Sequence, residues 1–168
     1  MNYIEILKQW IPFQTYSIIY HNEQDELSSR AINSKIKGKR NITLIVETME
    51  GYIFGTYHQN PIRTTVNGFY ARHLQEGGYF LFTLNNPLHT QPMQFFPSNL
   101  NDYLCIYNDD NENSLIGMCN AFELKKHRSF ISSDFSFYYR TEYLSSIFVG
   151  KVSPETFDLQ RLIIIEWK

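Results

Sequence analysis

The sequence predicts an α+β protein that is mostly β, with two packed antiparallel sheets forming a β-sandwich and a few short helices at its flanks. From residue 41 onward, short β-rich runs alternate with clusters of Gly, Pro, Asn and Asp, which is typical of antiparallel sheets rather than repeated βαβ units. The runs at 79–84 and 162–167 are apolar at both alternating positions, which indicates central strands covered on both faces. A hydrophobic content of 43% in 168 residues is enough for one domain with a packed core.

Residues 1–13 are predicted to form an N-terminal helical segment that docks on the domain formed by residues 14–168. Three apolar side chains fall on one face of a short helix, and the proline that follows would terminate it. These residues are Ile4, Leu7, Ile11 and Pro12. The segment equally fits the remainder of a longer partner-binding arm, in which case the chain is one domain of a larger regulator.

The elements that follow are a strand at 15–21 and a helix at 22–39. The helix has acidic residues early and lysines late, which suits the helix dipole, and Gly38 is placed to cap its end. Its core-facing residues are Leu27, Ala31, Ile32 and Ile36. Further strands are predicted at 41–48, 51–58, 77–86, 102–109, 114–125, 134–141 and 155–168.

Two glycines four residues apart, Gly51 and Gly55, lie in the stretch ETMEGYIFGTYH. Their spacing does not match a nucleotide-binding glycine loop, and charged residues interrupt the apolar segment that a membrane-helix contact requires. A β-hairpin remains, with Gly51 ending the turn at 48–51, where positive φ is often required. Gly55 lies inside the returning strand, where a missing side chain indicates a bulge or a close approach of another backbone segment.

This hairpin resembles the signature of the TLDc domain, which has a strand of the type ITLIVET, a turn ending in glycine and the run GYIFG. The closing run FDLQRLIIIEWK is similar to that family's last strand, and the resemblance covers about residues 14–168. It implies a non-enzymatic protein-interaction module. Such proteins are associated with protection against oxidative stress and with binding and regulation of the vacuolar proton-pumping ATPase, so protein partners including its subunits are expected.

Two segments depart from the family pattern. Where the family usually has a cluster of glycines, this chain has Gly117 followed by Met118 and Cys119, and residues 138–150 match only loosely.

The alternative is an enzyme with an unrecognised site, either a thiol-dependent peroxide scavenger that uses Cys105 or Cys119 or a hydrolase. Both cysteines lie in apolar runs and are predicted to be reduced core thiols. Neither has a basic neighbour in the sequence to lower its pKa, and no serine lies in a G-x-S-x-G motif. No catalytic residue is therefore predicted, although a histidine distant in sequence remains open as a partner.

No cofactor or metal site is predicted. The histidines lack the spacing that a zinc site needs. They are His21, His58, His73, His89 and His127. Asp109, Asn111 and Asn113 alternate as in a calcium loop, but Ser114 replaces the loop glycine and Asn120 stands where a bidentate Glu is required. A solvated hairpin turn is the prediction here.

The charge balance argues against a nucleic-acid partner, because the chain has 15 Lys and Arg residues and 17 Asp and Glu residues. No apolar run is long enough to span a membrane and no secretion signal is visible, so a soluble, cytoplasmic protein is expected.

The basic cluster at 35–40 either complements the helix dipole or meets an acidic partner or lipid head group. Phe69, Tyr70 and Arg72 form either an exposed interface anchor or part of the buried core.

Overall fold

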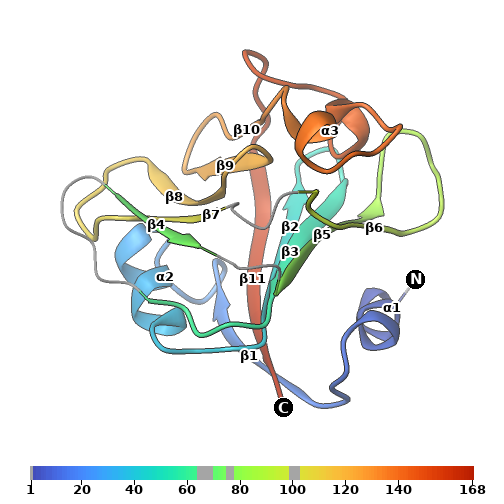
Figure 1. Ribbon diagram of the computed structural model, residues 1–168. Helices are drawn as coiled ribbons and strands as arrows, with labels where there is room; N and C mark the ends of the chain where they lie inside the picture. Colours follow the sequence, from blue (N-terminus) through green and yellow to red (C-terminus); the bar gives the residue numbers. More distant parts are fainter. Residues whose placement is uncertain (1, 64–69, 75–77, 99–102) are drawn as a thin grey trace.

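The fold has two antiparallel sheets packed face to face (Figure 1). The computed structural model describes residues 2–63, 70–74, 78–98 and 103–168. One sheet has the strand order β1 (Tyr16–His21), β11 (Leu159–Trp167), β2 (Ile42–Thr48), β3 (Ile53–His58), β5 (Tyr79–Asn85) and β6 (Met93–Phe95). The other has the order β10 (Phe130–Ile131), β9 (Phe122–Lys125), β8 (Ser114–Met118), β7 (Tyr103–Tyr107) and β4 (Tyr70–Leu74). The predicted mostly-β fold class with two antiparallel sheets is confirmed.

Short helices lie around the two sheets (Figure 1). They are α1 (Tyr3–Trp10), α2 (Ser29–Ile36), α3 (Phe135–Tyr138) and a 3₁₀ turn, η1 (Ser145–Ile147). The buried residues of α2, α3 and η1 join the core between the sheets, whereas those of α1 join a separate cluster. The helices therefore close the ends of the sandwich, except for α1, which covers an outer face.

Two hydrophobic clusters explain why some strands are apolar on both sides. In β5, Tyr79 and Leu81 point into the core between the sheets, while Phe80, Phe82 and Leu84 point to the opposite face. There they pack in the cluster that includes Leu7 and Ile11 from the N-terminal segment. Both faces of β5 are therefore covered, as its unbroken apolar run predicts, whereas Ile18 of the edge strand β1 stays 57% exposed. The expected docking of the N-terminal helix is confirmed.

The β2–β3 hairpin forms as predicted. Gly51 has φ +86°, and its backbone N–H donates to the carbonyl oxygen of Thr48 at 2.9 Å, which closes the turn. Gly55 lies where a Cβ would be 1.9 Å from the carbonyl oxygen of Leu44 and 2.7 Å from Phe82 Cζ. Glycine is needed at position 55 because another chain segment approaches closely there. The register between β2 and β3 is unbroken, so no bulge accounts for it.

The helix at 22–39 is shorter than predicted. It begins at Ser29, where the Ser28 side chain accepts a hydrogen bond from the Ala31 N–H at 3.1 Å, and Gly38 follows its end with φ +73°. The preceding residues form a turn, because the backbone N–H groups of Gln24 and Asp25 both donate to the His21 carbonyl.

The predicted strand at 134–141 is wrong, since α3 occupies this segment. A strand would place Phe135, Phe137 and Tyr139 on one face. The helical turn instead buries Phe135 and Tyr139, with ring centroids 4.9 Å apart, and leaves Phe137 78% exposed. Packing of two rings against the end of the core outweighs the local β preference of the aromatic residues. The predicted strand at 114–125 is likewise divided, by the turn between β8 and β9.

None of the helices in the described ranges is long and apolar enough to cross a membrane.

Candidate functional site

The outer face of the five-stranded sheet is the candidate site. Along β7, Leu104 and Ile106 point into the core, so Cys105 and Tyr107 lie on the other face. Register places Cys105 opposite Gly117 of β8, Gly117 opposite Glu123 of β9, and Glu123 opposite Phe130 of β10. These residues form a row across the sheet. The side chains of Cys105, Glu123 and Phe130 are half-buried, in contrast to the core residues beside them.

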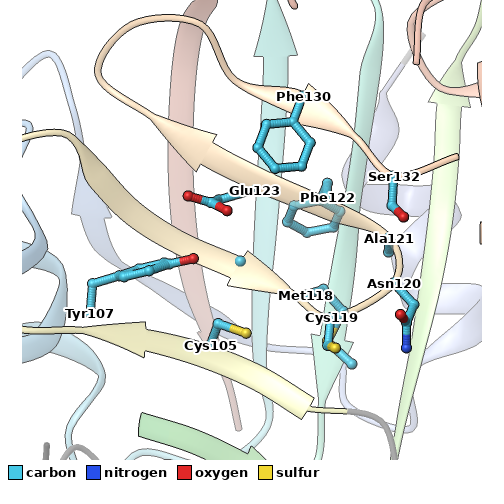
Figure 2. Close-up of a pocket in the computed structure, with 11 residues that line it drawn as sticks. Cys105, Tyr107, Met118, Cys119, Asn120, Ala121, Phe122, Glu123, Phe130 and Ser132 are labelled. Carbon is cyan, nitrogen blue, oxygen red and sulfur yellow. The ribbon is translucent and has the colours of Figure 1, made fainter. Parts of the chain in front are cut away.

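A hollow of about 400 Å³ lies over this row. Figure 2 shows the two cysteines at one end of the hollow, Phe130 at the other and Glu123 between them. The side chains that give it polar character are Cys105, Tyr107, Cys119, Asn120, Glu123 and Ser132. The volume lies within the range of small-ligand sites, about 300–1,000 Å³.

The local sequence forms this hollow in two ways. Gly117 contributes no side chain to the middle of the row, so its backbone forms part of the floor. The turn after β8 places Asn120 at φ +60°, a conformation that Asn tolerates better than most residues, and the Ala121 N–H donates to the Met118 carbonyl at 3.0 Å. The turn therefore brings Cys119 and Asn120 to the rim.

Electrostatically, the hollow is weakly acidic. The Glu123 carboxylate accepts a hydrogen bond from Ser114 Oγ at 2.9 Å and pairs with Lys125 Nζ at 3.4 Å. None of the described residues that line the hollow is Lys, Arg or His. Among them there is therefore no cationic side chain to favour a thiolate, and the negative charge of Glu123 disfavours one. Arg72 lies opposite Cys105 in the β4–β7 register, but its side chain is outside the described residues.

The prediction that the cysteines are core thiols needs correction. Both carry reduced thiols, but Cys105 and Cys119 are half-buried and line the surface hollow. The physical reason is the alternation of a strand, because a residue between Leu104 and Ile106 must face away from the core. That signal is present in the sequence and would have placed Cys105 on the outer face.

The histidines do not gather at this site. His58 is buried in β3, where its Nε2 lies 3.2 Å from Thr56 Oγ1 and its ring stacks on Tyr79. His21 lies at the end of β1, His89 in a loop, and His127 between β9 and β10. The side chain of His73 lies outside the described residues. In the described part of the chain, no three His, Cys, Asp or Glu side chains form a group that could hold a metal.

The calcium-like stretch is the turn of the β7–β8 hairpin, as predicted. The Asn111 side chain accepts hydrogen bonds from the backbone N–H groups of Asn113 and Ser114, at 3.1 and 2.7 Å. Asp109 Oδ1 accepts from Asn33 Nδ2 at 2.8 Å. These side chains stabilise the turn itself.

The structure describes one of the two predicted surface contacts, the basic cluster at 35–40, but not the other. In the basic cluster at 35–40, Lys35 pairs with Asp25 and Lys39 pairs with Glu166, each at 3.2 Å, so both cations hold neighbouring elements together. Phe69 and the side chains of Tyr70 and Arg72 lie outside the described residues, and that hypothesis stays a prediction.

The described residues form a two-sheet β-sandwich in which α1 packs on the outer face of the six-stranded sheet and the hollow lies on the outer face of the five-stranded sheet. The family model of the TLDc domain matches residues 1–165, and the chain belongs to the TLDc family. No curated protein matches the sequence. The division between residues 13 and 14 stays a prediction.

Proposed function

We propose that the protein is a non-enzymatic interaction module that binds a protein partner through the outer face of the five-stranded sheet. The observation that carries the proposal is the difference in cover between the two sheets. The apolar side chains of α1 pack on the six-stranded sheet, whereas the helices in the described part of the chain bury no apolar residue against the outer face of the five-stranded sheet. A rigid sheet with a shallow hollow suits recognition of another surface.

The chemistry of the hollow also favours binding over catalysis. A nearby cation favours the thiolate form of a cysteine, and the described residues that line the hollow include no Lys, Arg or His. Tyr107, Phe130 and Asn120 are instead residues that contact and orient a partner. The carboxylate of Glu123 is already held by Ser114 and Lys125, which fixes its position for a polar contact.

Membership of the TLDc family supports a more specific proposal. We infer that the protein acts in the cytoplasm, contributes to protection against oxidative stress, and binds and regulates the vacuolar proton-pumping ATPase.

A pull-down from a lysate that contains cytosol and vesicles tests this function. The wild-type protein should enrich subunits of the proton pump, and the double variant Tyr107→Ser/Phe130→Ser should lose them. The matched control is Phe137→Ser/Leu144→Ser, which removes two exposed apolar side chains from another surface. Failure of the wild-type protein to recover any pump subunit at low salt contradicts the proposed partner. Equal recovery by both double variants contradicts the proposed surface.

A thiol-dependent enzyme is the second candidate, favoured by the observation that both cysteines line one hollow. Peroxide would oxidise one thiolate to sulfenic acid, releasing hydroxide, and the second thiol would displace water from it to form a disulfide. Mass spectrometry of the native protein after one equivalent of peroxide tests this idea. A loss of two hydrogens that Cys119→Ser abolishes supports it, and unchanged thiols at that stage exclude it.

A further inference from the structure

A second hollow, of about 530 Å³, lies on the same sheet and shares Phe130 with the first. Four consecutive residues at 125–128, with the sequence KKHR, line it together with Phe130 and Thr156. They occupy the end of β9 and the turn that leads to β10. The hollow therefore gathers three permanent cations and a histidine around a space large enough for a small ligand.

The backbone of this turn is fixed by hydrogen bonds to other segments. The N–H groups of Lys126 and His127 donate to the carbonyl oxygen and to Oδ1 of Asn113, at 2.9 and 3.2 Å. The Arg128 N–H donates to Asp158 Oδ1 at 3.3 Å. Because these backbone amides already have hydrogen-bond partners, a ligand in the hollow would be bound by the side chains. The fixed backbone holds the Cα atoms of these side chains in place, which lowers the entropy cost of binding.

The cations in this hollow are poorly compensated. Lys125 pairs with Glu123 at 3.4 Å and lies 5.3 Å from the centroid of the Phe130 ring. Lys126 and Arg128 form no ion pair with any residue in the described ranges, whereas Lys35, Lys39 and Lys151 each have a carboxylate partner at 3.2 Å. Of the described residues that line the hollow, Glu112 is the one carboxylate. The described lining residues thus carry an excess of positive charge in a chain of net charge −2, and the Asp158 carboxylate, which accepts from the Arg128 N–H, lies next to them.

A phosphomonoester matches this arrangement better than other anions. It carries about −1.5 to −2 charges at neutral pH and three acceptor oxygens, so it can satisfy Lys126 and Arg128 together, with the Thr156 hydroxyl as a further donor. A single carboxylate neutralises only one cation.

We propose that the hollow lined by residues 125–128 binds a compact phosphomonoester group, carried by a soluble molecule or by a lipid head group. The proposal is independent of the protein partner, since it depends only on the charge and geometry of this hollow.

Titration of the full chain with inorganic phosphate and with inositol 1,4,5-trisphosphate tests it. Nuclear magnetic resonance at constant ionic strength should show saturable shifts of the amides of Asn113, Lys126 and Arg128, with acetate producing none. The variant Lys126→Gln/Arg128→Gln should lower the affinity at least tenfold. The control Lys35→Gln/Lys39→Gln, which also removes two positive charges, should leave the affinity within twofold. Denaturant unfolding of each variant verifies that it is folded.

Vesicles of phosphatidylcholine with and without a phosphorylated inositol lipid distinguish the two sources. If vesicle binding requires the phosphorylated lipid and is lost in Lys126→Gln/Arg128→Gln, the ligand is a lipid head group. If the protein binds the soluble phosphates but not the vesicles, the ligand is a soluble molecule. Three results would overturn the proposal. They are an equal loss of phosphate affinity in both double variants, equal amide shifts with acetate and with phosphate, and amide shifts at 126–128 that do not saturate.

Discussion

The outer faces of the two sheets differ although both sheets share one core. On the six-stranded sheet, outward residues such as Phe80, Phe82 and Ile165 are buried beneath α1. On the five-stranded sheet, the corresponding positions hold Cys105 and Glu123, and these are half-buried. The covered face contributes burial of apolar area, whereas the open face presents thiol, hydroxyl, carboxylate and ammonium groups to solvent. Under the proposed function, one outer face contributes to stability and the other recognises a partner.

A glycine within a strand has a different role in each sheet. Gly55 permits close packing in the covered sheet, where a Cβ would meet the Leu44 carbonyl at 1.9 Å. Gly117 opens space on the exposed sheet, where the nearest atom to a Cβ would be the Phe122 carbonyl oxygen at 3.1 Å.

The largest effect is expected for Gly55→Ala, which should lower the free energy of unfolding by at least about 3 kcal/mol, because backbone atoms must move to admit the methyl group. The matched variant Gly117→Ala should change stability by about 1 kcal/mol or less, since a shift of a few tenths of an ångström suffices and alanine loses less entropy in a strand. Urea unfolding of both proteins measures this contrast. Similar losses in the two variants would remove the distinction between the sheets.

Removal of the covering side chain Leu7 should have the next largest effect. Leu7→Ala leaves a cavity between α1 and the six-stranded sheet and should cost about 2–5 kcal/mol. Glu5→Ala is the control on the same helix, because its ion pair with Lys8 is exposed and such pairs contribute about 1 kcal/mol or less. If Leu7→Ala proves as mild as Glu5→Ala in denaturant unfolding, α1 does not stabilise the sheet.

A hydrogen bond within the covered sheet provides a smaller test. Trp167 Nε1 donates to Thr43 Oγ1 at 2.8 Å in a buried environment. Trp167→Phe should cost about 1–3 kcal/mol, partly because the Thr43 hydroxyl loses its donor. Adding Thr43→Val should recover part of that loss in a double-mutant cycle, whereas strict additivity would show that the two side chains are not coupled.

The smallest effect concerns the solvent-exposed edge of the same sheet. The His21 N–H donates to Asp25 Oδ2 at 2.9 Å, and this bond, followed by the nearby Lys35, holds the pKa of Asp25 below its ordinary value. The folded-state pKa is below the unfolded one, so the carboxylate stabilises the protein at neutral pH, and this contribution is lost as pH falls through the folded pKa. Thermal unfolding between neutral and acidic pH should show a slightly weaker acid dependence for Asp25→Asn. A stronger acid dependence of the variant would reverse the sign of the argument.

Much of the sandwich was predictable from local patterns. The two-sided apolar runs at 79–84 and 162–167 indicated covered strands, and Gly51 and Gly55 located the β2–β3 hairpin. The helical turn at α3 was not predictable, because the burial of Phe135 depends on the end of a core built from distant segments. The hollow lined by the cysteines was not predicted, because the apolar neighbours of both thiols indicate burial in the core.

Local patterns were enough to locate most of the longer strands, the glycine of the β2–β3 turn and the amphipathic α1, because these features follow from backbone sterics and from periodicity along the chain. Long-range packing sets the sheet that each strand joins and the outer face on which α1 packs. It also leaves Lys126 and Arg128 without carboxylate partners within the described ranges, while Lys35 and Lys39 have them. Those outcomes depend on residues far apart in the chain, such as Lys39 and Glu166, whose proximity no local pattern records.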